Sequence, residues 1–426
     1  MGIISKYKQS NSKREIKDVF YLMALQGLNY IAPLLVLPYL MKVLGAEKFG
    51  YIGFSLAVCQ YLMLIVDFGF NLSATKRIAI NKENHNRLNE IFSATIYSKI
   101  LLLFISFIIL LTIAAIPQFA IYKETMFLMF LMVVGNAFLW VFLFQGMGNI
   151  RIVSVVNTIA KLSILPLTFI LVKSSDDYLL AALIQSAVSV FAAIISIAII
   201  IRKKWVKLTS VCIKNCKEEI KESWPIFLSS AATSIYMALF VIALGYFCQA
   251  DDVGRYSAAD KIVRASIWIV VAPVIQSFYP KICELSQIDK AKAIRTAKII
   301  IAVILVPMIA ECLCFLFMPN YITDLLGEDY ANTQSIFMIM SVIPIFSGLS
   351  LSTSQLVVLA VHDKKKEYQR ICIFAGIIAI IGIFIAIPQM HAIGAAIVLD
   401  IIELFICALM LYHSNIFNIN KATKCQ

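Results

Sequence analysis

Residues 91–116, IFSATIYSKILLLFISFIILLTIAAI, contain a single charged residue, Lys99, in 26 positions. A helix needs about 20 mostly apolar residues to cross the roughly 30 Å hydrocarbon core of a bilayer, so this segment is long enough to span a membrane. Membrane-spanning β-strands alternate apolar and polar residues with a period of two, and that alternation is absent here. The segment therefore predicts a membrane-spanning α-helix.

Apolar runs of similar length fill the rest of the chain. Hydrophobic residues make up 61% of the 426 positions, the mean hydropathy is +0.87, and 15% of residues are charged, against about a quarter in soluble domains. We predict an all-α polytopic membrane protein with about twelve transmembrane helices. Their expected positions are 19–43, 50–74, 91–116, 125–147, 153–172, 178–201, 223–248, 256–280, 297–319, 333–361, 371–388 and 392–413. The tenth run contains Pro344 and Gly348 and is expected to bend.

Basic residues are distributed unevenly among the predicted loops. Most of the 37 Lys and Arg residues lie before the first run, in segment 202–222, and in the other connections on that same side. The positive-inside rule assigns this side to the cytoplasm, so both termini are expected there. The net charge of +12 then reflects loops that face anionic lipid head groups, and nucleic-acid binding is not expected.

The chain divides into two predicted six-helix lobes, residues 1–201 and 223–426, joined by the basic segment 202–222. An internal echo supports this division, because EKFG at 47–50 precedes the second helix and DDVG at 251–254 precedes the eighth. Such a repeat would be parallel, with an axis along the membrane normal and a central cavity between the lobes. Glycine and acidic residues are also common in short turns, which leaves a chance similarity as the alternative.

Several function classes are disfavoured by what the sequence lacks. No hydrophilic segment is longer than 202–222, which leaves no room for a soluble catalytic domain. Gly45 and Gly50 have the spacing of a P-loop, but Tyr51 and Ile52 stand where that motif requires Lys and Ser or Thr. The ten cysteines include no C-x-x-C pair and the four histidines are far apart in sequence, so we expect no metal site, no cofactor and no enzyme activity.

Ionisable residues inside the predicted spans are the candidate functional residues. A charge near the bilayer centre is unfavourable by about 3 kcal/mol, so it usually faces a cavity or an opposite charge. At 100° per residue, three charged side chains of the eighth span share one helix face. The predicted binding site for an anionic group consists of Lys161, Lys261 and Arg264, and the candidates for gating or ion coupling are Asp67, Asp260, Glu311, Asp400 and Glu403.

Each of these residues also has a structural interpretation. Asp260 and Arg264 could form an i,i+4 ion pair that only permits insertion. Lys99 could extend its amine to the membrane surface, and Asp67 could anchor a helix end. Asp400 and Glu403 could pair with Lys161 or Arg264 and never exchange a proton.

Three stretches of the chain resemble the bacterial polysaccharide transporters, the Wzx-type O-antigen flippases of the multidrug/oligosaccharidyl-lipid/polysaccharide exporter superfamily. The first combines QGLNY at 26–30, LPYL at 37–40 and VLGAEKFG at 43–50. The second is DFGFNLSATKR at 67–77, and the third begins with YSAADK at 256–261. The first eighty residues carry the most specific part of the resemblance, the eighth span is moderately specific, and the other spans match in hydropathy alone.

The resemblance implies a flippase that moves undecaprenyl-pyrophosphate-linked O-antigen repeat units from the cytoplasmic to the periplasmic leaflet of the bacterial inner membrane by alternating access. Its partners would be this glycan, membrane lipids, and the polymerase and chain-length regulator of the same pathway. A cation-lined cavity suits such a cargo, because Lys and Arg offset the unfavourable transfer of phosphates into a low dielectric.

Two other functions remain open from the sequence. An ion-coupled multidrug antiporter of the same superfamily would share the fold but carry cations, which the basic face of the eighth span disfavours. A membrane-embedded polysaccharide polymerase or glycosyltransferase usually carries a large extracytoplasmic loop or an Asp-x-Asp metal motif, and this sequence has neither.

Overall fold

The computed structural model describes residues 2–414. Side chains are described from residue 35 onward, except those of residues 150–151, 229–230, 232–237, 276 and 280. The predicted cytoplasmic C-terminus, at residues 415–426, and the motif QGLNY at 26–30 lie outside the residues whose side chains are described.

Residues 2–414 are helical almost throughout and contain no β-strand. The helices of the first half are α1 (Gly2–Asp67), α2 (Phe70–Ile80), α3 (His85–Ala114), α4 (Lys123–Phe138), α5 (Val141–Gly146), α6 (Ile150–Leu162), α7 (Ile164–Leu171) and α8 (Tyr178–Lys203). Those of the second half are α9 (Ile213–Phe247), α10 (Ala250–Ile288), α11 (Lys290–Phe317), α12 (Pro319–Leu326), α13 (Gln334–Met340), α14 (Ile343–Thr353) and α15 (Lys365–Ser414). Short 3-10 turns at Pro117–Tyr122, Ser175–Asp177 and Glu328–Thr333 and a π-helical turn at Ser354–Leu359 complete the described chain.

Helices α1 and α15 each contain a break. Each of them covers two of the predicted spans. The backbone leaves the helical conformation at Gly45 in α1 (φ 72°) and at His391 in α15 (φ 52°). Counting each as one, the described residues contain 8 helices long and apolar enough to cross a membrane, or up to 9 with a bent pair included. The chain is therefore a multi-pass helical membrane protein, and the number of twelve spans stays a prediction.

The bend predicted for the tenth span is confirmed. The helices over Glu328–Met340 and Ile343–Leu359 meet at an angle of 46°. Pro344 lies in the first turn of α14, where its missing N–H is tolerated and its ring disfavours a continuous helix through the preceding residues.

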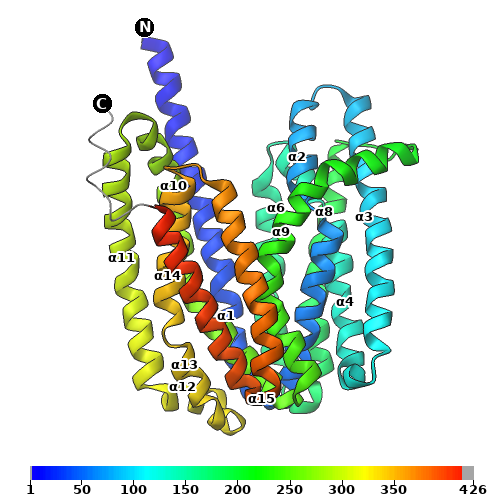
Figure 1. Ribbon diagram of the computed structural model, residues 1–426. Coiled ribbons are helices and arrows are strands. Elements are labelled where there is room, and N and C mark those ends of the chain that lie inside the picture. The colour runs from blue at the N-terminus through cyan, green and yellow to red at the C-terminus, as the bar shows by residue number, and fades with distance from the viewer. Residues whose placement is uncertain (1, 415–426) are drawn as a thin grey trace.

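Two groups of helices lie side by side in Figure 1, with α2, α3, α4, α6 and α8 on the right and α10 to α14 on the left. Helix α9 begins on the right-hand group, where Ser223 hydrogen-bonds Ser73 of α2. It ends against α15, where the rings of Phe247 and Phe384 are 6.1 Å apart. The two groups form the predicted two-lobe architecture, and α9 contacts both of them.

The lobes meet closely where α1 and α10 cross at Gly50 and Gly254. A β-carbon added at Gly254 would lie 1.8 Å from the carbonyl oxygen of Ala46, and one added at Gly50 would lie 2.1 Å from the carbonyl oxygen of Ala250. These are the two glycines that end the EKFG and DDVG segments. Only glycine permits backbones to approach this closely, so the sequence echo marks a contact between the lobes.

We expect Gly254→Ala to lower the melting temperature of the purified protein. Alanine is intrinsically the better helix former by about 1 kcal/mol, but the obstructing atom is a backbone carbonyl that a side-chain rotation cannot remove. Overpacking of this kind destabilises by about 1–3 kcal/mol. Gly348→Ala is the matched control, because its β-carbon would meet the flexible side chain of Met308. A Gly254→Ala protein as stable as the native protein would contradict the close contact.

Candidate functional site

A cavity of about 270 Å³ lies between the lobes and is lined by residues of α1, α9 and α10. Its volume is just below the range of about 300–1,000 Å³ that is typical of ligand pockets. The lining residues are Leu37, Gly53, Leu56, Ala57 and Gln60 of α1, Ala238 and Val241 of α9, and Ser257, Asp260, Lys261 and Arg264 of α10. All three charged residues of the predicted α10 face therefore reach one cavity.

The charged side chains of this cavity have different environments. The Arg264 guanidinium donates through Nε to Asp260 Oδ1 at 2.6 Å, so the i,i+4 ion pair considered from the sequence is present. Lys261 Nζ lies 4.6 Å from the centroid of the Phe49 ring, a cation–π contact. Two cations and one carboxylate line the cavity, which leaves it with an excess positive charge.

Lys161 lies apart from the lining of this cavity. It is near the end of α6, and its side chain is exposed. The structure therefore brings two of the three predicted anion-binding residues together, and the binding roles of all three stay predictions.

Arg264 also borders a second, smaller cavity inside the C-terminal group of helices. This pocket of about 70 Å³ is lined by Ser347 and Glu403 among others. Glu403 is buried and accepts a hydrogen bond from Ser347 Oγ at 2.8 Å. The Arg264 side chain thus connects the central cavity with a buried carboxyl group of α15.

The other two carboxyl groups predicted for this lobe are Asp400, which precedes Glu403 in α15, and Glu311 of α11. Asp400 is half-buried one turn before Glu403, and its Oδ1 is buried without a hydrogen-bond partner among the residues whose side chains are described. Glu311 of α11 accepts a hydrogen bond from Ser266 Oγ of α10 at 3.0 Å. The Ser266–Glu311 hydrogen bond joins α10 to α11 and places an acidic group beside the helix that carries Lys261.

Asp67 occupies a separate site in the N-terminal group of helices. Lys99 Nζ lies 3.0 Å from Asp67 Oδ1, and Asn136 Nδ2 donates to Asp67 Oδ2 at 2.9 Å. The Lys99 side chain is buried, so the interpretation that it extends to the membrane surface is wrong. The three residues come from α1, α3 and α4 and fix these helices to one another.

A further charge cluster joins α2 to the start of α9, outside the predicted spans. The Arg77 guanidinium contacts Glu219 and lies 3.2 Å from a carboxylate oxygen of Glu222. Burial raises the pKa of Glu219 to about 7, although the adjacent Arg77 charge acts to lower this pKa. The first turns of α9 are thereby attached to the N-terminal group of helices through a carboxyl group that titrates near neutral pH.

We expect the free energy of unfolding to fall as pH rises toward 7, because Glu219 loses its proton. Its pKa rises from 4.5 to about 7 on folding, so the folded protein binds the proton more tightly, and its contribution is fully present below about pH 4.5. Loss of the proton then removes about 3 kcal/mol. Melting temperatures of the native protein and Glu219→Gln, measured between about pH 5 and pH 8, should diverge in this direction. Glu284→Gln, at an exposed carboxylate near the end of α10, should keep the native pH dependence, and parallel curves for native and Glu219→Gln would contradict the assignment.

Sequence reasoning missed the residues that complete these sites. Phe49 was noted only within a turn motif, yet its ring contacts Lys261. Ser347, which donates a hydrogen bond to Glu403, lies in the predicted span 333–361, for which the sequence predicted only a bend. Neither residue differs in type from many others in apolar helices, so the sequence held no signal for these contacts.

A helical membrane protein of two lobes, with a charged cavity between them, has the architecture of a transporter. The chain belongs to the polysaccharide biosynthesis protein family, whose model matches residues 16–286. An Escherichia coli (strain K12) protein named "Putative O-antigen transporter" is 32% identical over 397 residues, which cover 93% of this chain and 95% of that protein. This membership confirms the resemblance found in the sequence.

Two solved structures share the fold at low sequence identity. The lipid II flippase MurJ in an inward closed conformation superposes with a TM-score of 0.75 and 13% identity, covering 92% of this chain and 87% of that one. An inward-facing multidrug resistance MATE family transporter of the MOP superfamily gives a TM-score of 0.64 and 14% identity, covering 94% of this chain and 96% of that one. The fold alone therefore does not separate a lipid-linked cargo from a drug.

Proposed function

We propose that this protein is a flippase that moves undecaprenyl-pyrophosphate-linked oligosaccharide units, the O-antigen repeats, from the cytoplasmic to the periplasmic leaflet of the bacterial inner membrane. The observation that carries the proposal is the excess positive charge of the cavity between the lobes, supplied by Lys261 and Arg264. The name of the Escherichia coli relative, an O-antigen transporter, supports a cargo of this class.

The chemistry of the cavity fits a pyrophosphate. Lysine binds phosphate as a compact point charge, and the planar guanidinium of arginine matches two phosphate oxygens at once. The Asp260 carboxylate lies 2.6 Å from the Arg264 guanidinium. A phosphate that enters the cavity would compete with this carboxylate for Arg264 and meet Lys261 directly, while the lipid tail stays in the hydrocarbon.

Alternating access would move residues 1–201 and 223–426 as two bodies joined by 202–222. The close crossing of α1 and α10 at Gly50 and Gly254 would hold the lobes together in one state and separate in the other. Proton binding at Asp400 and Glu403 is the proposed coupling, because Arg264 borders both the cargo cavity and the pocket of Glu403. Asp67 is then a structural residue in our scheme, since Lys99 and Asn136 satisfy its carboxylate.

The proposed orientation puts both termini in the cytoplasm, and the basic residues of 202–222 support it. The polymerase and chain-length regulator of the same pathway are the proposed partners at the opposite surface. Enzyme functions are disfavoured, because the curated relative carries the name of a transporter.

The second candidate, a multidrug antiporter, is favoured by one observation, the fold similarity to a MATE transporter. Its cargo would be cationic, and Lys261 and Arg264 would repel it.

Proteoliposomes that contain the purified full-length protein distinguish the two. Undecaprenyl-pyrophosphate-linked oligosaccharide is placed in both leaflets, and the fraction that reaches an enzyme added outside is followed with time. We expect rapid exchange of the pyrophosphate-linked glycan and none of an uncharged glycolipid with the same glycan. A protein that moves cationic dyes but leaves the pyrophosphate-linked glycan in place would overturn the proposal.

A further inference from the structure

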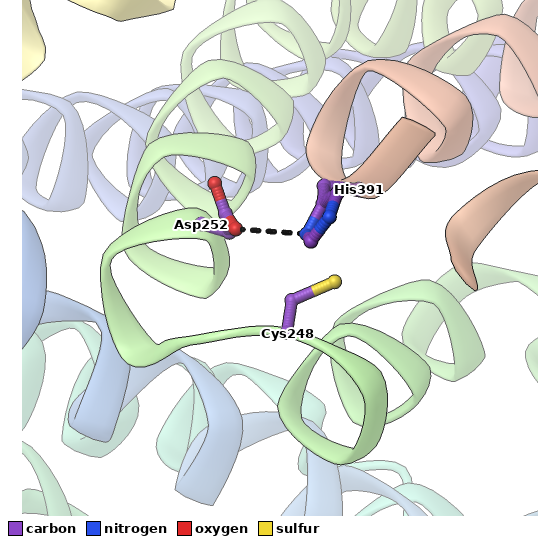
Figure 2. A group of neighbouring side chains, drawn as sticks. All are labelled: Cys248, Asp252 and His391. Atoms are coloured by element: carbon purple, nitrogen blue, oxygen red, sulfur yellow. Dashed lines mark ion pairs between the residues drawn. The ribbon is translucent and has the colours of Figure 1, made fainter. Parts of the chain in front are cut away.

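Three side chains with metal-binding chemistry come together away from the central cavity. Cys248 directly follows α9, Asp252 lies in the first turn of α10, and His391 is at the break in α15. Their donor atoms all lie within 4.8 Å of one another, and Figure 2 shows the three side chains gathered around one space. His391 Nδ1 and Asp252 Oδ2 are 3.4 Å apart.

The backbone at His391 is unusual for a residue with a side chain. Its φ of 52° and ψ of −132° interrupt α15, and a non-glycine residue is disfavoured in such a sparsely populated region. The break directs the imidazole across to Asp252, a residue of another helix. Strain of this kind persists where the surroundings hold it, and a bound ligand at the imidazole would be one such restraint.

We propose that Cys248, Asp252 and His391 form a zinc site. A thiolate, an imidazole and a carboxylate are the three kinds of ligand that proteins offer to Zn²⁺. Tetrahedral bonds of about 2.0–2.1 Å put neighbouring ligand atoms about 3.3–3.4 Å apart, and the separation of the His391 and Asp252 atoms is 3.4 Å. Ca²⁺ and Mg²⁺ require mostly oxygen ligands, and the cluster offers oxygen from only one of its three side chains.

Zinc would occupy the site with three protein ligands and one water molecule. The thiol of Cys248 must release its proton to solvent when the metal binds, so affinity should rise with pH. Bound zinc would connect the break in α15 to the start of α10, two residues from Gly254 at the crossing of the lobes. The site shares no residue with the central cavity, so it does not depend on which cargo the protein carries.

Calorimetric titration of the metal-free, full-length protein with Zn²⁺ tests the proposal. We expect one Zn²⁺ per chain, and an affinity weakened by about 100-fold or more in Cys248→Ser and in His391→Ala. Cys314→Ser and His85→Ala are matched controls at exposed residues outside the cluster, and they should bind as the native protein does. Equal affinity in the native protein, Cys248→Ser and His391→Ala would overturn the site.

Co²⁺ provides a second measurement that needs no variant to fold. Tetrahedral Co²⁺ bound by a thiolate has intense visible bands and a sulfur-to-cobalt charge-transfer band in the near ultraviolet. The native protein should develop both at one equivalent of Co²⁺ and lose both when Zn²⁺ is added. A Co²⁺ complex without the charge-transfer band, or no stoichiometric complex, would show that Cys248 is not a ligand and that the proposed site is wrong.

Discussion

Replacing Lys261 by alanine should slow transport of the pyrophosphate-linked glycan by about 30-fold or more, because truncating one partner of a desolvated charge pair costs about 2–5 kcal/mol. The change leaves Arg264 opposite Asp260 at 2.6 Å, so the lining would hold one cation and one carboxylate. A cavity without excess positive charge no longer offsets the dehydration of a pyrophosphate. The measurement is the initial rate in proteoliposomes as a function of glycan concentration, at matched protein content.

Three further variants are compared with Lys261→Ala in the same transport assay. Lys261→Arg keeps the charge and should retain part of the rate. Lys290→Ala removes an exposed lysine at the start of α11 and should transport as the native protein does. Lys161→Ala tests the third predicted residue, which lies outside the cavity lining. A native rate in Lys261→Ala together with a large loss in Lys161→Ala would move the anion site to the N-terminal lobe.

The fold followed from the sequence because length and hydropathy carry most of the information in a membrane helix. A run such as residues 91–116 must form a helix, since lipid offers no partner to its backbone N–H and C=O groups. Local periodicity was also sufficient for α10, where Asp260, Lys261 and Arg264 share one face and one cavity.

Hydropathy and helical periodicity could not predict the contacts between helices. Lys161 and Lys261 are both lysines inside apolar runs, yet only Lys261 lines the central cavity. The difference depends on how α6 and α10 are packed and rotated, and tertiary packing sets those angles. The expectation of no metal site rested on sequence spacing, which does not register that Cys248 and His391 approach across two helices.

The similar segments EKFG at 47–50 and DDVG at 251–254 could be interpreted only in part from the sequence. The two segments lie about half the chain apart, which indicated a repeat, but nothing in the sequence explained why either place requires a glycine. The structure supplies that reason, because Gly50 and Gly254 allow two backbones to cross within van der Waals contact. The two similar segments therefore contact each other, because Gly50 approaches the backbone of Ala250 and Gly254 approaches the backbone of Ala46.

Replacing Lys99 by methionine should destabilise the protein by about 1–3 kcal/mol, because the Asp67 carboxylate that loses its ionic partner is 29% exposed and keeps one hydrogen bond. Lys99 is buried, and its amine lies 3.0 Å from Asp67. Methionine fills similar space but leaves the Asp67 carboxylate with Asn136 as its remaining hydrogen-bond donor, at 2.9 Å, among the described side chains. The measurement is equilibrium unfolding of the purified protein in detergent, with membrane abundance as a second readout.

The double variant Lys99→Met/Asp67→Asn separates the charge from the packing. Removing both charges leaves no uncompensated ion, so the double variant should be more stable than Lys99→Met, with a coupling of about 1–3 kcal/mol between the two sites. Lys82→Met is the control for methionine itself, because that lysine is exposed in the turn between α2 and α3 of the same lobe and its replacement should change stability by less than about 0.5 kcal/mol. If Lys99→Met and the double variant unfold alike, the loss comes from packing around α3, and Asp67 regains its place as a candidate for ion coupling.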